Sequence, residues 1–352
     1  MGGSDRGWSD PHVGVLPFAD SGGTCESGSG AGGLEAIRGR PAGARRIGEM
    51  LLGSVSDKLV RTNRSDMVAD LPRRLFAIVL LAALPAIAGC DSPNHQLFEA
   101  AHSGSPAEVE AALRAGANVN ALNWEGQTPL MFAVSRNDAA VVRSLVAAGA
   151  EINIGDSKAV TPLMFAASRS DAVVARTLIQ AGADVNARDG SGATALMIAG
   201  RHNGAAVIRA LIEAGADVNV RDRRGATALM IAAAHNKAAA VRTLIEGRAE
   251  VNGRAEGGWT ALMIAAQGNG AAVVQALIEA GADVNAPDRD GATALMIASR
   301  HNGPAVVQAI LDAGAIVNLT DRLGRTAADH AKQNDRIEGT ELAGRLHGTA
   351  LE

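Results

Sequence analysis

The chain has 352 residues with a formal net charge of -4, and 47% of its residues are hydrophobic. Aromatic residues make up only 2% of the chain and tyrosine does not occur, so a core must be built from Ala, Leu, Ile, Val and Met. The net charge does not favour a polyanionic partner. The two cysteines, Cys25 and Cys90, are too few for a disulfide framework.

Residues 1–66 are rich in Gly, Ser and Arg and show no sustained helical or strand period. Such a segment is typical of disorder or of an upstream extension of the true reading frame. Met1, Met50 and Met67 are therefore candidate start sites, and Met67 fits best because a signal-like segment follows it.

Residues 67–89 have the layout of a signal peptide. Arg73 and Arg74 precede an apolar run from Leu75 to Ala88, which is shorter than the roughly 20 apolar residues of a membrane-spanning helix. We therefore expect export. The alternative is a buried helix with a coincidental cysteine at its end.

The residues from Ile87 to Cys90 resemble the lipobox of bacterial lipoproteins. This resemblance implies that Cys90 becomes the first residue of the mature protein and carries acyl chains. Because one acyl chain binds a membrane only marginally, the several chains typical of that family would hold the protein stably at a bilayer. Asp91 resembles an inner-membrane retention residue. We expect a periplasmic protein that is lipid-anchored, with the inner membrane favoured, and in which residues 90–94 form a short tether.

Beyond this segment one motif recurs with a fixed period, clearest in the stretch from Thr194 to Ala226. Its opening threonine returns every 33 residues, at Thr128, Thr161, Thr194, Thr227, Thr260, Thr293 and Thr326. A fixed period of this size predicts a solenoid, in which each unit buries its apolar face only against its neighbours.

Each unit predicts two short helices. The threonine caps the first helix, with Pro129 and Pro162 at the first helical position of two units. An asparagine nine residues after the threonine ends that helix in the left-handed conformation, at Asn137, Asn203, Asn236, Asn269 and Asn302. A second helix with one apolar face ends at Gly215 in the clearest unit. The residues up to Ala226 then cross to the next unit through a turn that suits a short β-hairpin finger.

The motifs TPLMFA, TALMIA and AGADVN resemble the signature of the ankyrin repeat. This resemblance implies an all-α fold, an ankyrin-repeat solenoid of helix-turn-helix units joined by short β-hairpin fingers. The domain would span residues 95–349. It would comprise an amino-terminal unit (95–127), six full units (128–325) and a closing unit (326–349).

The chain departs from the family pattern at two kinds of position. Methionine replaces the family histidine at Met131, Met164, Met197, Met230, Met263 and Met296. We expect interior packing, because helices packed about 8–10 Å apart hold thioethers of successive units too far apart to share a Cu(I) ion easily. Gly247 and Arg248 stand where other units have Ala-Gly, so Arg248 occupies a position that needs a permissive backbone. We expect this unit to be the least stable unit of the repeat array.

The repeats contain no pairing of nucleophile and base, no HExxH motif and no CxxC motif. Asp329 and His330 suggest an acid-base pair, but they fall where the closing helix needs packing. We expect no enzymatic activity, no cofactor, no metal site and no small-molecule substrate.

The resemblance also implies that a partner protein binds the concave surface made by the fingers and the exposed ends of the first helices. Carried over position by position, this face is strongly basic, whereas acids such as Glu213 and Asp217 fall outside it. The candidate groove residues are Arg136, Arg169, Arg188, Arg201, His202, Arg221, Arg223, Arg224, His235, Arg254, Trp259, Arg289, Arg300, His301 and Arg322. The histidines His202, His235 and His301 share one position, which predicts partner binding that strengthens below neutral pH.

The sequence therefore predicts a non-enzymatic protein-protein interaction scaffold, membrane-tethered outside the cytoplasm, that binds an acidic partner surface through a basic concave groove. One alternative is a rigid structural spacer with no specific groove ligand. Another is a cytosolic ankyrin protein, if the signal is not used. Nucleic acid is not expected, because of export and because the groove lacks aromatic stacking residues.

Overall fold

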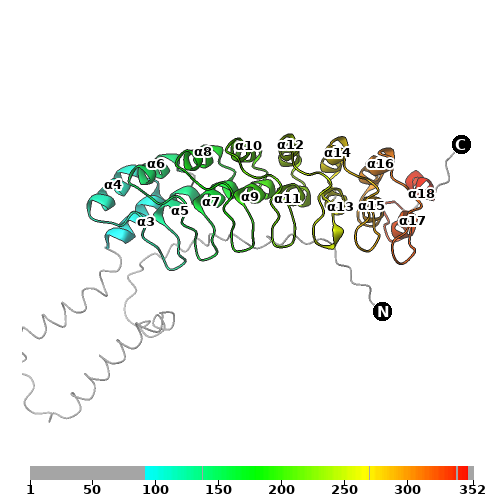
Figure 1. Cartoon of the computed structure of the whole chain (residues 1–352), viewed down its shortest axis with the longest axis horizontal. Helices are drawn as coiled ribbons and strands as arrows, with labels where there is room; N and C mark the ends of the chain where they lie inside the picture. Colours follow the sequence, from blue (N-terminus) through cyan, green and yellow to red (C-terminus); the bar gives the residue numbers. More distant parts are fainter. Residues whose placement is uncertain (1–91, 137, 269, 338–339, 348–352) are drawn as a thin grey trace, which may run out of the picture. The chain divides into compact units, whose positions relative to one another are not determined.

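The computed structural model describes residues 92–136, 138–268, 270–337 and 340–347. The predicted segments 1–66 and 67–89, together with Cys90, lie outside these residues. The described residues form pairs of helices that stack side by side, with an inner layer next to a row of loops and an outer layer on the far side of it (Figure 1). In this part of the chain no helix is long and apolar enough to cross a membrane.

Eight helices form each layer of the described residues. The inner helices are α3 (Pro93–Ser103), α5 (Pro129–Ser135), α7 (Pro162–Arg169), α9 (Ala195–Arg201), α11 (Ala228–Ala234), α13 (Ala261–Gln267), α15 (Ala294–His301) and α17 (Ala327–Ala331). The outer helices are α4 (Pro106–Arg114), α6 (Ala139–Ala147), α8 (Ala172–Gln180), α10 (Ala205–Glu213), α12 (Ala238–Glu246), α14 (Ala271–Glu279), α16 (Pro304–Asp312) and α18 (Glu341–Leu346). A short 3-10 turn, η2 (Glu256–Gly258), lies in one of the loops.

The repeated threonines begin the inner helices from α5 to α17, as the sequence predicts. In α9 the Thr194 hydroxyl oxygen accepts a hydrogen bond from the backbone N–H of Met197 at 3.4 Å, which satisfies one of the amides that a helix start leaves unpaired. The same bond forms at the start of every inner helix from α5 to α17. Pro129 and Pro162 occupy the first helical turn, so their predicted position is confirmed.

The core lies between the two layers and between neighbouring pairs. Inner helices such as α9 and α11 contact each other, as do outer helices such as α10 and α12. The six repeated methionines are at most 1% exposed, so the prediction of interior packing is confirmed. Ala, Leu, Val, Ile and Met side chains fill the core. Each pair is stabilised mainly by burial against the next pair along the chain.

The ends of the inner helices follow the sequence prediction in part. Asn203 and Asn236 have φ of 63° and 54°, which confirms the left-handed end at these two residues. Asn137 and Asn269 lie outside the described residues. The prediction for Asn302 is wrong: its φ is -116°, and α15 continues through His301.

The fully buried side chain of Asn302 explains this difference. The side-chain nitrogen of Asn302 donates to the backbone carbonyl of Ala266. The backbone carbonyl of Asn302 accepts from the side-chain nitrogen of Asn334 at 2.7 Å. The next residue, Gly303, has an extended backbone, which is the conformation favoured before a proline such as Pro304. The helix end is therefore set by buried amide bonds to neighbouring repeats.

The outer helices end at residues with positive φ. Gly215 has a φ of 87°, as predicted, and a Cβ added to it would meet no atom within 4 Å. Arg248 holds the corresponding position with a φ of 67°. An L-residue with a bulky side chain is strained in this region, so the unusual backbone expected at Arg248 is confirmed.

We use the term fingers for the seven five-residue loops at 123–127, 156–160, 189–193, 222–226, 255–259, 288–292 and 321–325. The β-hairpins predicted for these loops do not form, since the described residues contain no strand. In the fourth finger the Asp222 carboxylate instead accepts hydrogen bonds from the backbone N–H groups of Arg224 and Ala226. Neighbouring fingers share a single backbone bond, such as that from the Arg223 N–H to the Ser191 carbonyl at 3.3 Å. One backbone hydrogen bond between loops this short does not form a β-sheet.

A row of asparagines joins successive repeats, and we call it the asparagine ladder. In each member the side-chain oxygen accepts from the backbone N–H of the residue 31 positions later, at 2.8–2.9 Å. In five of them the side-chain nitrogen also donates to the carbonyl 29 positions later. The six are Asn120, Asn153, Asn186, Asn219, Asn252 and Asn285.

Candidate partner-binding surface

The predicted groove residues on the inner helices lie at the carboxyl ends of these helices. His202 and His235 are the residues that end α9 and α11, and His301 is the last residue of α15. We call this set the inner-helix row, with members Arg136, Arg169, Arg201, His202, His235, Arg300 and His301. Arg136, Arg169, His202 and His301 are exposed, and the other three are half-buried.

Positive charge concentrates around His202. Although His202 is exposed, partial desolvation of its ring lowers its pKa below the ordinary value, and the nearby charges of Arg201, His235, Lys237 and Arg169 lower it further. Cations from three successive repeats therefore act on one imidazole. The inner-helix row carries a positive potential at this point.

The residues that begin the outer helices contribute to the charge near His202. Asp138 and Asp171 begin α6 and α8, and their carboxylates accept hydrogen bonds from the first backbone amides of those helices. The next two repeats have Gly204 and Lys237 at the same position. The aspartate that begins α6 and α8 is thus replaced by an uncharged residue before α10 and by a cation before α12.

The predicted finger residues fall into two groups with different surroundings. Arg188, Arg221 and Arg254 each donate to a backbone carbonyl of the following repeat, namely those of Arg221, Arg254 and Pro287 at 2.5–2.6 Å. These three guanidinium groups are therefore engaged in bonds that join repeats. Arg223, Arg224, Arg289 and Arg322 stand on the turns of their fingers and are exposed.

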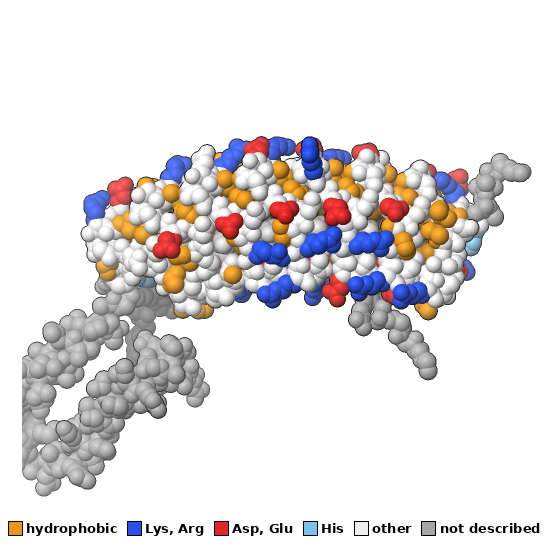
Figure 2. Space-filling model, in the orientation of Figure 1, with side chains coloured by type: hydrophobic (Ala, Val, Ile, Leu, Met, Phe, Trp, Pro, Cys, Tyr) orange, Lys and Arg blue, Asp and Glu red, His pale blue; other side chains and the backbone are white. Residues whose placement is uncertain are grey.

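One of the repeat-joining arginines also contacts an acid. Arg221 lies 3.4 Å from the carboxylate of Glu250, whose backbone N–H belongs to the asparagine ladder. Figure 2 shows the wider pattern on this face: acidic side chains form one row, and lysine or arginine side chains form a second row closer to the fingers. Partial pairing of charges makes this face less basic than the count of its arginines suggests.

Two further predicted residues have local partners. Trp259 lies at the base of the fifth finger, where its carbonyl accepts from the backbone N–H of Ala255. Its half-buried ring lies beside Gly257, because a Cβ there would come within 3.0 Å of Trp259. Arg322 lies 3.6 Å from the exposed carboxylate of Asp290, a weak surface pair.

The geometry of paired helices, threonine caps and fingers agrees with the comparison to known families. The family model described as ankyrin repeats (3 copies) matches residues 84–156, 149–222, 196–288, 252–321 and 269–342. The chain belongs to the ankyrin repeat family. Ankyrin repeats are protein-binding modules, so the chain is an ankyrin repeat protein of the interaction-scaffold type. No curated protein sequence matches it.

The last of the ankyrin repeats holds a buried charged cluster. Asp321 in the seventh finger accepts from His330 at 3.1 Å and from Arg325 at 2.8 Å. Burial raises the pKa of Asp321, but hydrogen bonds from Arg325 and His330 outweigh it and leave the pKa below its ordinary value. Burial lowers the pKa of His330, although Asp321 opposes this. As expected, His330 is a packed residue, and it pairs with Asp321 rather than with Asp329.

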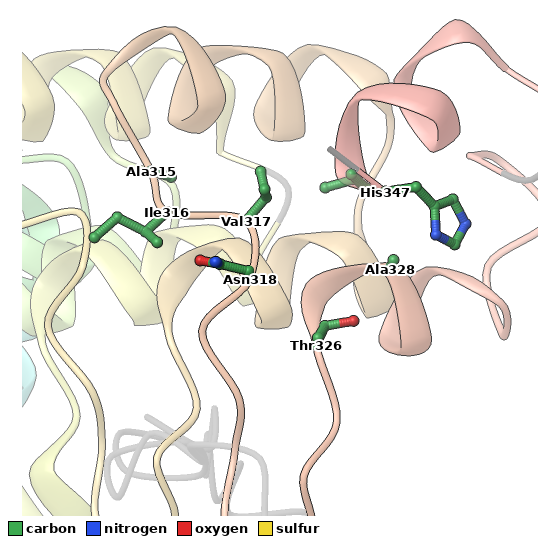
Figure 3. Close-up of a pocket in the computed structure, with 8 residues that line it drawn as sticks. Ala315, Ile316, Val317, Asn318, Thr326, Ala328 and His347 are labelled. Atoms are coloured by element: carbon green, nitrogen blue, oxygen red, sulfur yellow. The ribbon is translucent and has the colours of Figure 1, made fainter. Parts of the chain in front are cut away.

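A pocket of about 640 Å³ lies beside this last repeat, and no member of the inner-helix row lines it. Figure 3 shows the residues that border it: Ile316, Val317 and Asn318 from the segment after α16, Thr326 just before α17, Ala328 in α17, and His347 just after α18. Asn318 stands one period after Asn285. It has no hydrogen-bond partner among the described residues, so the asparagine ladder of these ankyrin repeats ends in an open position.

Two features of the surface escaped the sequence prediction. Lys237 adds to the charge at His202, and the available signal was a single basic residue at a position that is Asp or Gly in the other five full repeats. Lys158 contributes a cation to the second finger, in a column of mixed character. The Cys90 lipidation site lies outside the described residues.

Proposed function

We propose that the chain is a non-enzymatic scaffold that binds an acidic surface of a partner protein through its inner-helix row. The observation that carries the proposal is the set of cations around His202, because Arg169, Arg201, His235 and Lys237 all lower the pKa of that imidazole. These groups place positive charge from three successive repeats around one imidazole. An acidic partner would be attracted by the whole group.

Exposed arginines on the fingers can also bind an acidic partner. Arg223 and Arg289 are exposed on turns that are fixed by aspartate carboxylates, so each guanidinium is carried by a defined backbone. Arginine is well suited to binding carboxylates, because its planar group can donate two parallel hydrogen bonds. The proposed binding surface therefore runs from the inner-helix row of α9 and α11 onto the neighbouring fingers.

A matched charge-reversal experiment tests this proposal. The double variant Arg201→Glu with Lys237→Glu reverses two charges next to His202. The double variant Arg209→Glu with Arg242→Glu reverses two exposed charges on α10 and α12, on the outer layer, and changes the net charge equally. Proteins cross-linked to the wild-type chain in membrane extracts of the source cells are then identified by mass spectrometry.

We expect specific partners to be lost from the first variant and kept by the second. Their capture should also weaken as salt concentration rises, because exposed charges are screened. Equal capture by both variants would contradict the groove proposal and would favour the rigid spacer, which needs no groove ligand.

We also propose that Cys90 carries a lipid that holds the scaffold at a membrane outside the cytoplasm. The support is the sequence from Arg73 to Cys90. Three residues from Cys90 to Pro93 span at most about 11 Å, so an acyl anchor would keep the first repeat next to the bilayer. Mass spectrometry of the membrane-extracted chain tests this: an acylated amino-terminal Cys90 is expected, and an intact Met1 terminus would favour the cytosolic alternative.

A further inference from the structure

A cleft of about 410 Å³ opens among the second, third and fourth fingers. Its walls are Lys158, Asp189, Gly190, Ser191, Asp222, Arg223 and Arg224. Lys158 and Arg223 belong to fingers two repeats apart, yet both line the same space. The volume lies within the range of small-ligand sites, which is about 300–1,000 Å³.

The third finger leaves this space open because it carries a glycine at the relevant position. The equivalent residue is Arg223 in the fourth finger and Glu256 in the fifth, whereas Gly190 has no side chain. Gly190 also lies close to its neighbour: its N–H donates to the Lys158 carbonyl at 2.8 Å, and a Cβ would come within 3.2 Å of that oxygen. The cleft is thus a gap in the row of finger side chains, with fixed walls.

The carboxylates of the cleft already have partners within their fingers. Asp189 accepts from the N–H groups of Ser191 and Ala193 and from the Ser191 hydroxyl at 2.6 Å. Asp222 accepts from the N–H groups of Arg224 and Ala226 in the same way. These bonds all end on the Oδ1 atoms, so each aspartate holds the turn of its own finger through that oxygen.

The two cations at the sides of the cleft differ from these carboxylates in their surroundings. Lys158 and Arg223 are both exposed, and neither has an acidic partner among the described residues. They flank a finger whose turn, Gly190 and Ser191, brings no charge of its own. The cleft therefore presents two unpaired positive groups around a gap that accepts a side chain.

We propose that this cleft binds one carboxylate side chain, Asp or Glu, from the partner protein. Lys158 would approach the carboxylate from the second finger and Arg223 from the fourth, with the side chain lying over Gly190. This inference rests on the proposed function, in which the partner is acidic. It adds a defined contact point on the fingers, distinct from the inner-helix row.

The test uses the full chain labelled with nitrogen-15 and two peptides as probes. One is an acetylated and amidated Gly-Glu-Gly-Glu-Gly peptide, and the other replaces both Glu by Gln. We expect the Glu peptide to shift the amide signals of Gly190 and Gly192 in a saturable way, and the Gln peptide to leave them unchanged. Equal shifts with both peptides would overturn the carboxylate site.

Variants connect these shifts to the two cations. Lys158→Glu and Arg223→Glu should each weaken the binding seen at Gly190 about tenfold. Arg209→Glu on α10 is the matched control and should leave it unchanged. Thermal melting followed by circular dichroism shows that each variant folds.

The outcome separates this site from the proposed function. Glu-peptide shifts at His202 and Lys237 without shifts at Gly190 would overturn the cleft and leave the scaffold proposal standing. Shifts at Gly190 that persist in both variants would overturn the roles of Lys158 and Arg223. Shifts at Gly190 alone, combined with partner capture that ignores Arg201 and Lys237, would support the cleft and contradict the inner-helix row.

Discussion

The side chain of Asn252 holds the backbone of the next repeat at two points. Its oxygen accepts from the N–H of Asp283 at 2.8 Å, and its nitrogen donates to the carbonyl of Gly281 at 3.0 Å. Both partners are main-chain groups just after an outer helix. The asparagine ladder thus fixes where each outer helix ends relative to the repeat before it.

Replacing Asn252 by Ala should lower the free energy of unfolding by about 1–2 kcal/mol, because two side-chain hydrogen bonds to backbone groups are lost. Asn318→Ala is the matched control. Asn318 has the same place in its repeat but no partner among the described residues, so its loss should change stability little. Urea unfolding followed by circular dichroism measures both, and equal losses would show that the ladder is not the cause.

Arg248→Gly should stabilise the chain. Arg248 has a φ of 67°, which an L-residue adopts at a cost of about 1–2 kcal/mol, and glycine removes that cost while adding some freedom to the unfolded chain. We expect a net gain of about 0.5–1 kcal/mol. The reciprocal change, Gly215→Arg, should destabilise the neighbouring repeat. A fall in melting temperature for Arg248→Gly would show that the arginine makes compensating contacts.

Arg221 and Arg223 should differ although they stand two residues apart. Arg221 donates to the carbonyl of Arg254 at 2.5 Å, so Arg221→Ala should cost about 0.5–1 kcal/mol, a small value because the guanidinium is partly exposed to solvent. Arg223→Ala should leave stability nearly unchanged and weaken binding of the acidic probe. The two variants are compared by urea unfolding and by peptide titration. Equal stability losses would contradict this division of roles.

The ring of His202 should titrate below its ordinary value near 6.5. Burial is the first cause and the neighbouring cations the second, so Arg201→Gln should raise the pKa of His202 while Arg209→Gln should not. Proton NMR of the imidazole measures each value. A wild-type titration at or above 6.5 would contradict the positive potential proposed here.

The direction of this pKa shift also sets the pH dependence of stability. The folded pKa of His202 is lower than the unfolded one, so the unfolded chain takes up its proton first. The contribution of His202 to stability is therefore present above about pH 6.5 and is lost as the pH falls toward the folded value. Binding of an acidic partner follows the opposite trend, because protonation adds positive charge to the inner-helix row.

The sequence predicted those features that depend on one repeat alone. The threonine caps, the buried methionines and the glycine at the end of α10 all follow from spacing and from backbone preference. Asn302 escaped prediction because a buried contact with Ala266 in the preceding repeat overrides its local tendency. The prediction of β-hairpins was wrong because aspartates such as Asp222 accept hydrogen bonds from the finger N–H groups that a strand would have used.

The candidate surface was harder to predict for the same reason. The sequence places Arg188, Arg221 and Arg254 on the fingers, but the carbonyl that each one binds lies in the following repeat. Spacing along the chain does not indicate which side chains find such acceptors. The basic character of the inner-helix row was expected, whereas the contribution of Lys237 near His202 depends on the residue that begins the adjoining outer helix.

The asparagine ladder forms the same hydrogen bonds between any two neighbouring full repeats. Each asparagine binds main-chain groups, which every residue type except proline supplies, so these bonds do not depend on the side chains of its neighbour. An in-frame deletion of residues 195–227 would join Thr194 to Ala228 and bring Asn186 opposite the N–H of Glu250 in the register that Asn219 uses now. Genes for such arrays can therefore gain or lose whole copies by recombination, and the length of the binding surface can change while these asparagine bonds are kept.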